Sequence, residues 1–280
     1  MNERKIFSKE ETITELENLS KFQLPRWAFR GEKYYEYPLR TSLARFFDRA
    51  SYNGPKKLKV EKNLLREFER RYHHYSFSEP RVDSEIEWLS LMRHYGAPTR
   101  LLDFTYSIYV AAYFAVEDIS EKEDGFIYGI NLDWCQDAAS KVINAHGRNG
   151  KWVTKPLSRK EDEKTFKSLF FNSHQIDMVV AMNPFLLNQR ITTQLSVFIC
   201  PGNVNKEFSE NLKALDGCEQ PANTIKIKIP NKSRINILRS LFDMNINRAS
   251  LFPGLDGFAR SLGCFIRLSS MILTPKNDPL

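Results

Sequence analysis

The chain has 280 residues, of which 42 % are hydrophobic and 12 % aromatic, enough apolar material to bury a sizeable core and to exclude a globally disordered protein. Its apolar runs fall short of the roughly 18 residues that a membrane span needs, so no membrane partner is expected. The net charge of +7 is uneven: residues 1–75 carry 17 Lys and Arg against 11 Asp and Glu, residues 220–280 carry 9 against 3, and the middle is acidic. The two basic ends are either a phosphate-attracting surface or a solvated face that keeps the protein soluble.

The cysteines and the N-terminal residues indicate the cellular compartment of the protein. The four cysteines are far apart in sequence and form no CxxC pair, which argues against a disulfide framework or a zinc site. Residues 1–17 are rich in Glu and Lys and lack the apolar stretch of a secretory signal. Both features fit a cytoplasmic protein.

The first half of the chain alternates short strands with amphipathic helices. Ser8 can cap a helix over 8–19, and Pro25 separates it from an apolar strand over 27–31. Helices are predicted over 41–48, 60–75 and 85–94, with a loop over 51–59. Gly96-Ala97-Pro98 must end the third of these helices. An extended segment over 99–104 then leads into a helix over 106–117, whose alanines allow it to lie close against a sheet.

The second half is predicted mainly as strands. Strands are expected over 126–130, 179–182, 195–200 and 225–229, and helices over 161–171 and 235–242. The segment over 134–178 is less regular and is expected to be helical in parts, and a Pro-Gly break precedes a final helix within 250–262. No repeat, linker or composition shift divides the chain, so we expect one α+β domain with sheet and helices.

Three groups of polar residues stand out. Arg30 and Gly31 end an apolar strand, where an Arg suits a phosphate or carboxylate and a Gly admits a ligand or a second backbone; a surface Arg before a turn is the commoner case. The segment His94–Thr105 carries more polar groups than a strand-to-helix turn requires, although Asp103 or Thr105 can simply cap the next helix. Gln194 lies at the mouth of an apolar strand, either to bond a ligand or as an edge residue without a role.

Other common sites have no sequence signature in this chain. There is no phosphate-binding glycine loop, no zinc protease motif, no nucleophile elbow and no obvious carboxylate pair. His73, His74 and His174 lack partners at metal-ligand spacing, so no metal is expected.

Taken together, these motifs resemble the FRG domain family. The resemblance rests on Phe29-Arg30-Gly31, the run from His94 to Thr105, and Ala111–Ala115, with weaker signatures at 190–194 and 251–257. It spans residues 22–262 and leaves an N-terminal helix in 1–21 and a tail in 263–280.

The layout of the family is similar to that of ADP-ribosyltransferases, which implies a split antiparallel β-sheet flanked by helices. By this resemblance the substrate is NAD, and the implied binding residues are Arg30, Gly31, His94, Tyr95, Thr99, Arg100 and Thr105. Within that set Arg30 would clamp the NAD diphosphate. His94, Thr99 and Thr105 would line the nicotinamide side, while Asp103 and Gln194 would handle the ribose and bond cleavage.

The implied catalytic residues are therefore Arg30, Asp103 and Gln194, and one of them departs from the pattern. ADP-ribosyltransferases usually carry a Glu at the third position, whose charge stabilises an oxocarbenium-like transition state, and Gln194 offers only a dipole. Either the reaction is slower, or Asp103 or His94 supplies the base, or the protein binds without reacting.

The resemblance implies a toxin-like or phage-defence effector that modifies nucleic acid or protein. Its expected partners are NAD, a DNA or RNA acceptor held by the basic ends, and a cognate antitoxin. A non-catalytic nucleotide or nucleic-acid binding module is the alternative, and a metal-independent nuclease using His94 and Asp103 is a third.

Overall fold

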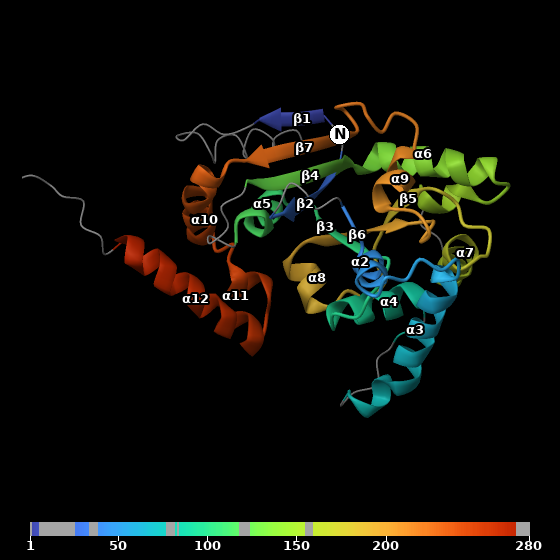
Figure 1. Ribbon diagram of the computed structural model, residues 1–280, viewed down its shortest axis with the longest axis horizontal. Coiled ribbons are helices and arrows are strands. Elements are labelled where there is room, and N and C mark those ends of the chain that lie inside the picture. The colour runs from blue at the N-terminus through green and yellow to red at the C-terminus, as the bar shows by residue number, and fades with distance from the viewer. Residues whose placement is uncertain are drawn as a thin grey trace, which may run out of the picture.

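The computed structural model describes residues 2–5, 26–33, 39–76, 82, 84–117, 124–154 and 159–272 (Figure 1). The helix predicted over 8–19 lies outside them. One seven-stranded sheet forms the centre, in the order β1-β7-β4-β2-β3-β6-β5. Its strands are β1 (Asn2–Lys5), β2 (Trp27–Glu32), β3 (Leu102–Thr105), β4 (Gly125–Asn131), β5 (Val179–Met182), β6 (Ser196–Pro201) and β7 (Thr224–Ile229). All neighbouring strands are antiparallel except β1 and β7, so the expected α+β class with a single sheet is confirmed.

The two halves of the sheet meet at a narrow junction. β2 pairs with β4 over six residues, whereas β2 and β3 share only the pair Phe29 and Thr105. Beyond this pair the two strands separate. The side chain of Arg30 spans the gap there, and its Nη1 donates a hydrogen bond of 2.7 Å to the carbonyl oxygen of Asp103.

Alternation along the central strands creates two apolar cores, one on each face of the sheet. Along β4, Phe126 and Tyr128 belong to one core and Ile127 to the other. The isoleucines of β7 join the second core, while Lys226 and Lys228 point to the opposite face at alternate positions. There the Lys226 ammonium lies 4.4 Å from the centre of the Phe126 ring. Every residue of β4 is buried, as a strand covered on both faces requires.

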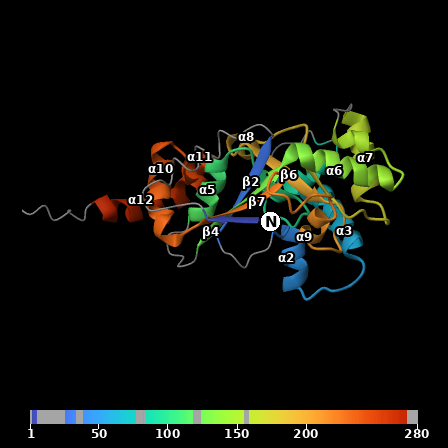
Figure 2. The same cartoon turned by 90° about the horizontal axis from the view of Figure 1, so that it is seen from above.

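Helices cover both faces and extend the domain at its two ends (Figures 1 and 2). The α-helices are α2 (Ser42–Arg49), α3 (Lys57–Arg71), α4 (Glu85–His94), α5 (Ile108–Val116), α6 (Leu132–Ala145), α7 (Arg159–Phe170), α8 (Gln189–Thr193), α9 (Phe208–Lys213), α10 (Arg234–Asp243), α11 (Arg248–Leu251) and α12 (Leu255–Ile272). Short 3₁₀ turns are η1 (Tyr72–His74), η2 (Gly150–Val153) and η3 (Asn231–Ser233). α5 and α10 pack on the core that contains Phe29, and α4, α6 and α7 on the other.

Helix α5 lies unusually close to the sheet because glycines face it. A Cβ atom added to Gly31 would lie 2.0 Å from the carbonyl oxygen of Ala111, and one added to Gly125 would lie 2.6 Å from that of Ala115. These distances are far below any real contact, so only glycine fits at either strand position. The close approach predicted from the alanines is thus matched by glycines on the strands. Ser107 caps the helix by accepting a hydrogen bond from the Val110 N–H, so neither Asp103 nor Thr105 is its cap.

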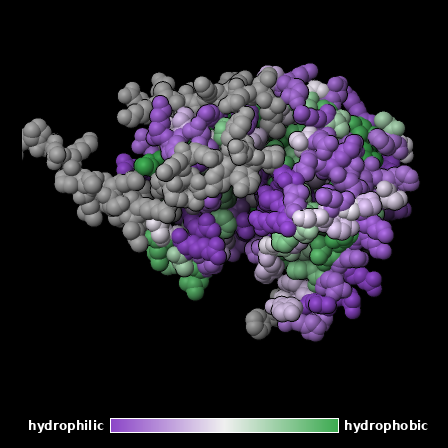
Figure 3. Space-filling model, in the orientation of Figure 1, coloured by the Kyte–Doolittle hydropathy of each residue, from purple (hydrophilic) through white to green (hydrophobic). Residues whose placement is uncertain are grey.

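The C-terminal helix α12 leans away from the sheet and packs chiefly on α11 (Figure 1). Leu255, Phe258 and Leu262 share one face of it and are exposed, and Figure 3 shows apolar side chains at this end of the helix. The helix crosses residue 262, where the domain was expected to end. Within the described ranges, no helix has the combined length and apolarity to cross a bilayer.

Most predicted elements are found within a few residues of their expected bounds. α4 and β5 begin and end as predicted, and α2 begins directly after its cap, Thr41. Among the strands and α-helices, five elements were not predicted individually: the edge strand β1, the long helix α6, most of which lies in a stretch expected to be helical in parts, and the short helices α8, α9 and α11. α3 begins at Lys57, so the predicted loop over 51–59 is shorter than expected.

Candidate functional site

A cavity of about 450 Å³ lies at the junction between β2 and β3. Its wall combines segments far apart in sequence: β2, β3, the turn from α8 into β6, and residues of α2, α4, α5 and Phe252. The lining residues are Phe29, Arg30, Gly31, Glu32, Lys33, Arg45, Arg49, Arg93, Asp103, Phe104, Thr105, Phe114, Glu117, Arg190, Gln194, Ser196 and Phe252. The structure therefore brings Arg30, Asp103, Thr105 and Gln194 together, as the sequence motifs predicted.

Arg30 is held by the protein on two sides. Its Nε donates to the Glu32 carboxylate at 2.7 Å, and its Nη1 donates to the Asp103 carbonyl oxygen. The Arg30 side chain is 14 % exposed, and it closes the gap between β2 and β3. Arg30 consequently shapes the cavity floor, with only part of its donor set left for a ligand.

Asp103 is a carboxylate that its neighbours hold in place at the cavity. Its Oδ2 accepts hydrogen bonds from both Nε and Nη2 of Arg93, the former at 2.8 Å. Burial acts to raise the pKa of Asp103, but the charges of Arg93, Arg30 and Arg190 outweigh it, and the pKa is lowered. Asp103 is therefore ionised at neutral pH.

Gln194 and Thr105 form one hydrogen-bonded unit. The Thr105 hydroxyl donates to the Gln194 carbonyl oxygen at 2.7 Å and accepts from the Ser107 N–H, so it has no proton left for a ligand. The Gln194 carboxamide nitrogen donates to the Leu251 carbonyl oxygen at 2.9 Å. Within the part of the chain that the structure describes, no donor reaches Gln194 Oε1. This oxygen is available to accept a hydrogen bond from a ligand hydroxyl.

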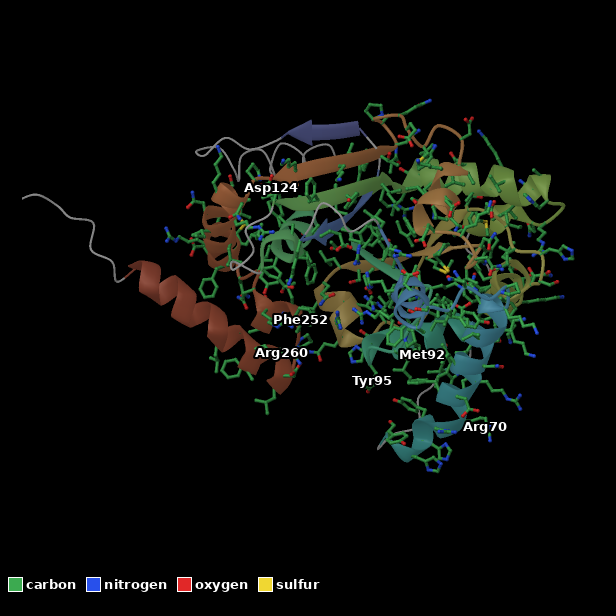
Figure 4. All side chains as sticks on the ribbon, viewed as in Figure 1. Arg70, Met92, Tyr95, Asp124, Phe252 and Arg260 are labelled. Atoms are coloured by element: carbon green, nitrogen blue, oxygen red, sulfur yellow. The ribbon has the colours of Figure 1, made fainter. Side chains whose placement is uncertain are left out.

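His94 and Tyr95 lie farther out at the end of α4. His94 lines a small recess of about 20 Å³ that shares Asp103, Arg190 and Gln194 with the cavity. Burial and the charge of Arg190 lower the pKa of His94, so its ring is neutral at pH 7. Tyr95 is 65 % exposed and packs on Tyr72, and Figure 4 shows it beyond Met92, at the end of α4 that is nearer to Phe252. Tyr95 does not line the cavity.

Thr99 and Arg100 are the two implied ligand residues that the structure places deepest in the protein. The Thr99 backbone binds Ser42 and Leu43 and anchors the start of α2. Arg100 forms a fully buried ion pair with Glu61 of α3 and donates to the carbonyl oxygens of Pro201 and Gly202 at the end of β6. Both residues are fully buried and neither borders the cavity, so the structure does not bring them together with Arg30, Asp103 and Gln194.

Gly31 lines the cavity, but a side chain is excluded at this position because the backbone of Ala111 in α5 lies too close. Of the two reasons proposed for a glycine here, the approach of another backbone is the one observed.

The cavity also contains cations that were not among the expected site residues. Arg45 and Arg49 come from α2, Arg93 from α4 and Arg190 from α8. The Arg190 guanidinium lies 4.7 Å from the centre of the Phe252 ring, and that of Arg248 lies at the same distance. Six cationic residues and three acidic ones line the cavity, which therefore favours an anionic ligand. The sequence signal for Arg45 and Arg49 was their spacing of four residues, although the helix predicted over 41–48 ended one residue before Arg49.

In the described ranges no cluster of three or more His, Cys, Asp or Glu side chains is arranged to hold a metal ion. Comparison with known proteins gives one match: residues 25–124 fit the family model of the FRG domain. The matched segment includes Phe29-Arg30-Gly31 and the run from His94 to Thr105, and it supports the resemblance drawn from those motifs. No curated protein and no solved structure matches the chain.

Proposed function

From an FRG-type segment with an arginine-lined cavity, we propose that the protein binds NAD and transfers its ADP-ribosyl group to a nucleic acid or protein acceptor. The observation that carries the proposal is the convergence of Arg30, Asp103 and Gln194 on one cationic cavity from separate parts of the chain. Its volume falls within the roughly 300–1,000 Å³ typical of small-molecule sites. The diphosphate of NAD supplies the negative charge that the lining favours.

In the proposed reaction the bond between the nicotinamide nitrogen and ribose C1′ breaks, and its electron pair leaves with nicotinamide. An acceptor nitrogen or oxygen forms the new bond to C1′ and loses a proton. Positive charge develops on the ribose as the bond breaks, and an ionised carboxylate in the cavity stabilises it. Asp103 is such a carboxylate, although its pairing with Arg93 weakens its field.

Gln194 and His94 complete the assignment. Gln194 Oε1 accepts a hydrogen bond from a ribose hydroxyl, while its nitrogen remains bound to Leu251. His94 is a neutral base beside the same residues and takes the acceptor proton. The protein would act as a toxin-like or phage-defence effector in the cytoplasm, with a cognate antitoxin as its natural counterpart.

The test is NAD consumption by the purified protein, with and without mixed DNA or RNA, following free nicotinamide by chromatography. Nicotinamide release that rises with nucleic acid is expected. Arg30→Ala and Gln194→Ala should each abolish it, and Arg71→Gln, on the exposed face of α3, should not. Circular dichroism on each variant separates loss of chemistry from loss of fold. Full activity in both Arg30→Ala and Gln194→Ala would refute the proposal.

A non-catalytic nucleotide-binding module is the second candidate, favoured by the pairing of the acids. Glu32, Asp103 and Glu117 each form an ion pair with a neighbouring cation. Because all three carboxylates are paired with cations, they repel a bound anion only weakly, and the cavity can hold one without reacting with it. This candidate predicts saturable binding of ADP-ribose with no nicotinamide released over hours.

A further inference from the structure

The arginines at the cavity differ in whether the protein neutralises them. Arg30 pairs with Glu32, and Arg93 pairs with Asp103. Arg45 and Arg49 have no carboxylate partner among the described residues. The third acid, Glu117, is already held by Lys33 and Arg248.

Arg45 and Arg49 present their charges to the same space. They lie four residues apart on α2, so their side chains are neighbours on one helix face, and both line the cavity. Like charges at this spacing destabilise a helix by a few tenths of a kcal/mol. Burial lowers the pKa of Arg45, and the nearby charges of Arg30, Arg93 and Arg49 act in the same direction, opposed by Glu32. Among the described residues, Arg45 and Arg49 therefore form a positive cluster at the cavity that no carboxylate pairs with.

The hydrogen-bond donors of Arg45 and Arg49 also indicate an anion site. Arg45 uses its Nη1 for the Arg40 carbonyl oxygen at 3.0 Å, and Arg49 makes no hydrogen bond to any described residue through its side chain. Most of their guanidinium donors thus make no hydrogen bond within the described part of the chain, whereas Nε and Nη1 of Arg30 already donate to the protein. A phosphate is matched by the planar fork of an arginine, and two arginines side by side match two linked phosphates.

We propose that Arg45 and Arg49 of α2 form the diphosphate-binding subsite of the cavity, in place of the clamp that the family resemblance assigned to Arg30. The ligand class is a nucleoside diphosphate ester. That the ester is NAD rests on the proposed function, but the diphosphate subsite does not. Arg30 then acts as a positioning residue that holds β2 to β3.

The experiment is isothermal titration of the full chain with ADP-ribose, with adenosine and nicotinamide as phosphate-free probes and inorganic pyrophosphate as a competitor. The variants are Arg45→Gln, Arg49→Gln and the double substitution, because glutamine keeps the helix propensity of α2. Arg66→Gln, on the exposed face of α3, is the matched control. Charge-assisted hydrogen bonds of the usual strength predict that each single variant weakens ADP-ribose binding about 10-fold or more, and the double variant about 100-fold.

The outcomes separate the subsite from the transferase activity. Pyrophosphate should compete with ADP-ribose in the wild type, and adenosine should bind equally to wild type and variants. Wild-type affinity for ADP-ribose in the double variant would overturn the subsite, and so would a wild type that binds neither ADP-ribose nor pyrophosphate. NAD consumption with an unchanged KM in the double variant would overturn the subsite and leave the transferase standing. ADP-ribose binding that needs both arginines, without nicotinamide release from NAD, would establish the subsite and refute the transferase.

Discussion

Replacing Arg100 with methionine should remove a large part of the stability of this domain. Arg100 and Glu61 are 0 % and 1 % exposed, and the Arg100 Nε lies 2.8 Å from Glu61 Oε1. The guanidinium also lies 5.7 and 5.4 Å from the ring centres of Phe170 and Phe171. In Arg100→Met the Glu61 carboxylate stays buried without its partner, which costs about 3–5 kcal/mol. Domains are typically stable by only about 5–15 kcal/mol, so the variant should be marginal.

The double variant Glu61→Leu with Arg100→Met isolates the cause. It removes both charges and keeps the volume nearly constant, so most of the lost stability should return. Urea unfolding followed by circular dichroism measures the free energy of unfolding for wild type, single and double variants. A loss below about 1 kcal/mol in Arg100→Met, or a double variant no more stable than the single one, would refute the reasoning. Because Arg100 lies away from the cavity, the double variant should bind ADP-ribose as the wild type does.

Four further predictions follow from particular contacts. The pKa of Asp103 is lowered in the folded state, so the stability it contributes is present above the unfolded pKa of about 3.9 and is lost as pH falls through the folded pKa. The stability gap between wild type and Asp103→Asn should therefore close in urea titrations below about pH 4. Removing the charge in Arg190→Gln should raise the pKa of His94, which ring-proton NMR measures; an unchanged value would mean that burial alone sets it. Gly31→Ala should lose about 1–3 kcal/mol by overpacking against Ala111, whereas Gly263→Ala, with nothing within 4 Å of the new methyl, should be neutral or stabilising; equal thermal shifts would contradict this contrast. The buried Thr99 hydroxyl has no hydrogen-bond partner among the residues that the structure describes, so Thr99→Val should keep or raise the melting temperature and leave NAD binding unchanged.

Local patterns in the sequence predicted most of the fold. α4 was found at its predicted bounds because a capping serine, an apolar face and the Gly-Ala-Pro break all mark it locally. β1 was missed because an edge strand of four polar residues carries no alternation, and its pairing with β7 bridges more than 200 residues. α8 was missed because five residues are too few to show a helical period.

The site was predicted only in part, because residues that are close together in one sequence motif can have different roles in the structure. The run from His94 to Thr105 mixes residues with different tasks, and neighbours in sequence diverge in space. Asp103 faces the cavity, whereas Arg100, three residues earlier, is buried against α3. Sequence alone gives no sign of this, because the partner of Arg100 is Glu61, 39 residues away on another helix. Arg45 and Arg49 of α2 were not predicted as site residues, because a charged helix face usually faces solvent and not a cavity.

The narrow junction of the sheet has a consequence for how the protein responds to a ligand. The two halves are joined by one pair of residues, Phe29 and Thr105, and by the chain of polar contacts from Glu32 through Arg30 and Asp103 to Arg93. An anion in the cavity would touch groups carried by both halves. Its binding would connect the two halves at the junction where β2 and β3 share a single residue pair. Ligand binding should therefore stabilise the sheet. A bound anion of this kind would add contacts between the two halves of the sheet at the place where few backbone hydrogen bonds connect them.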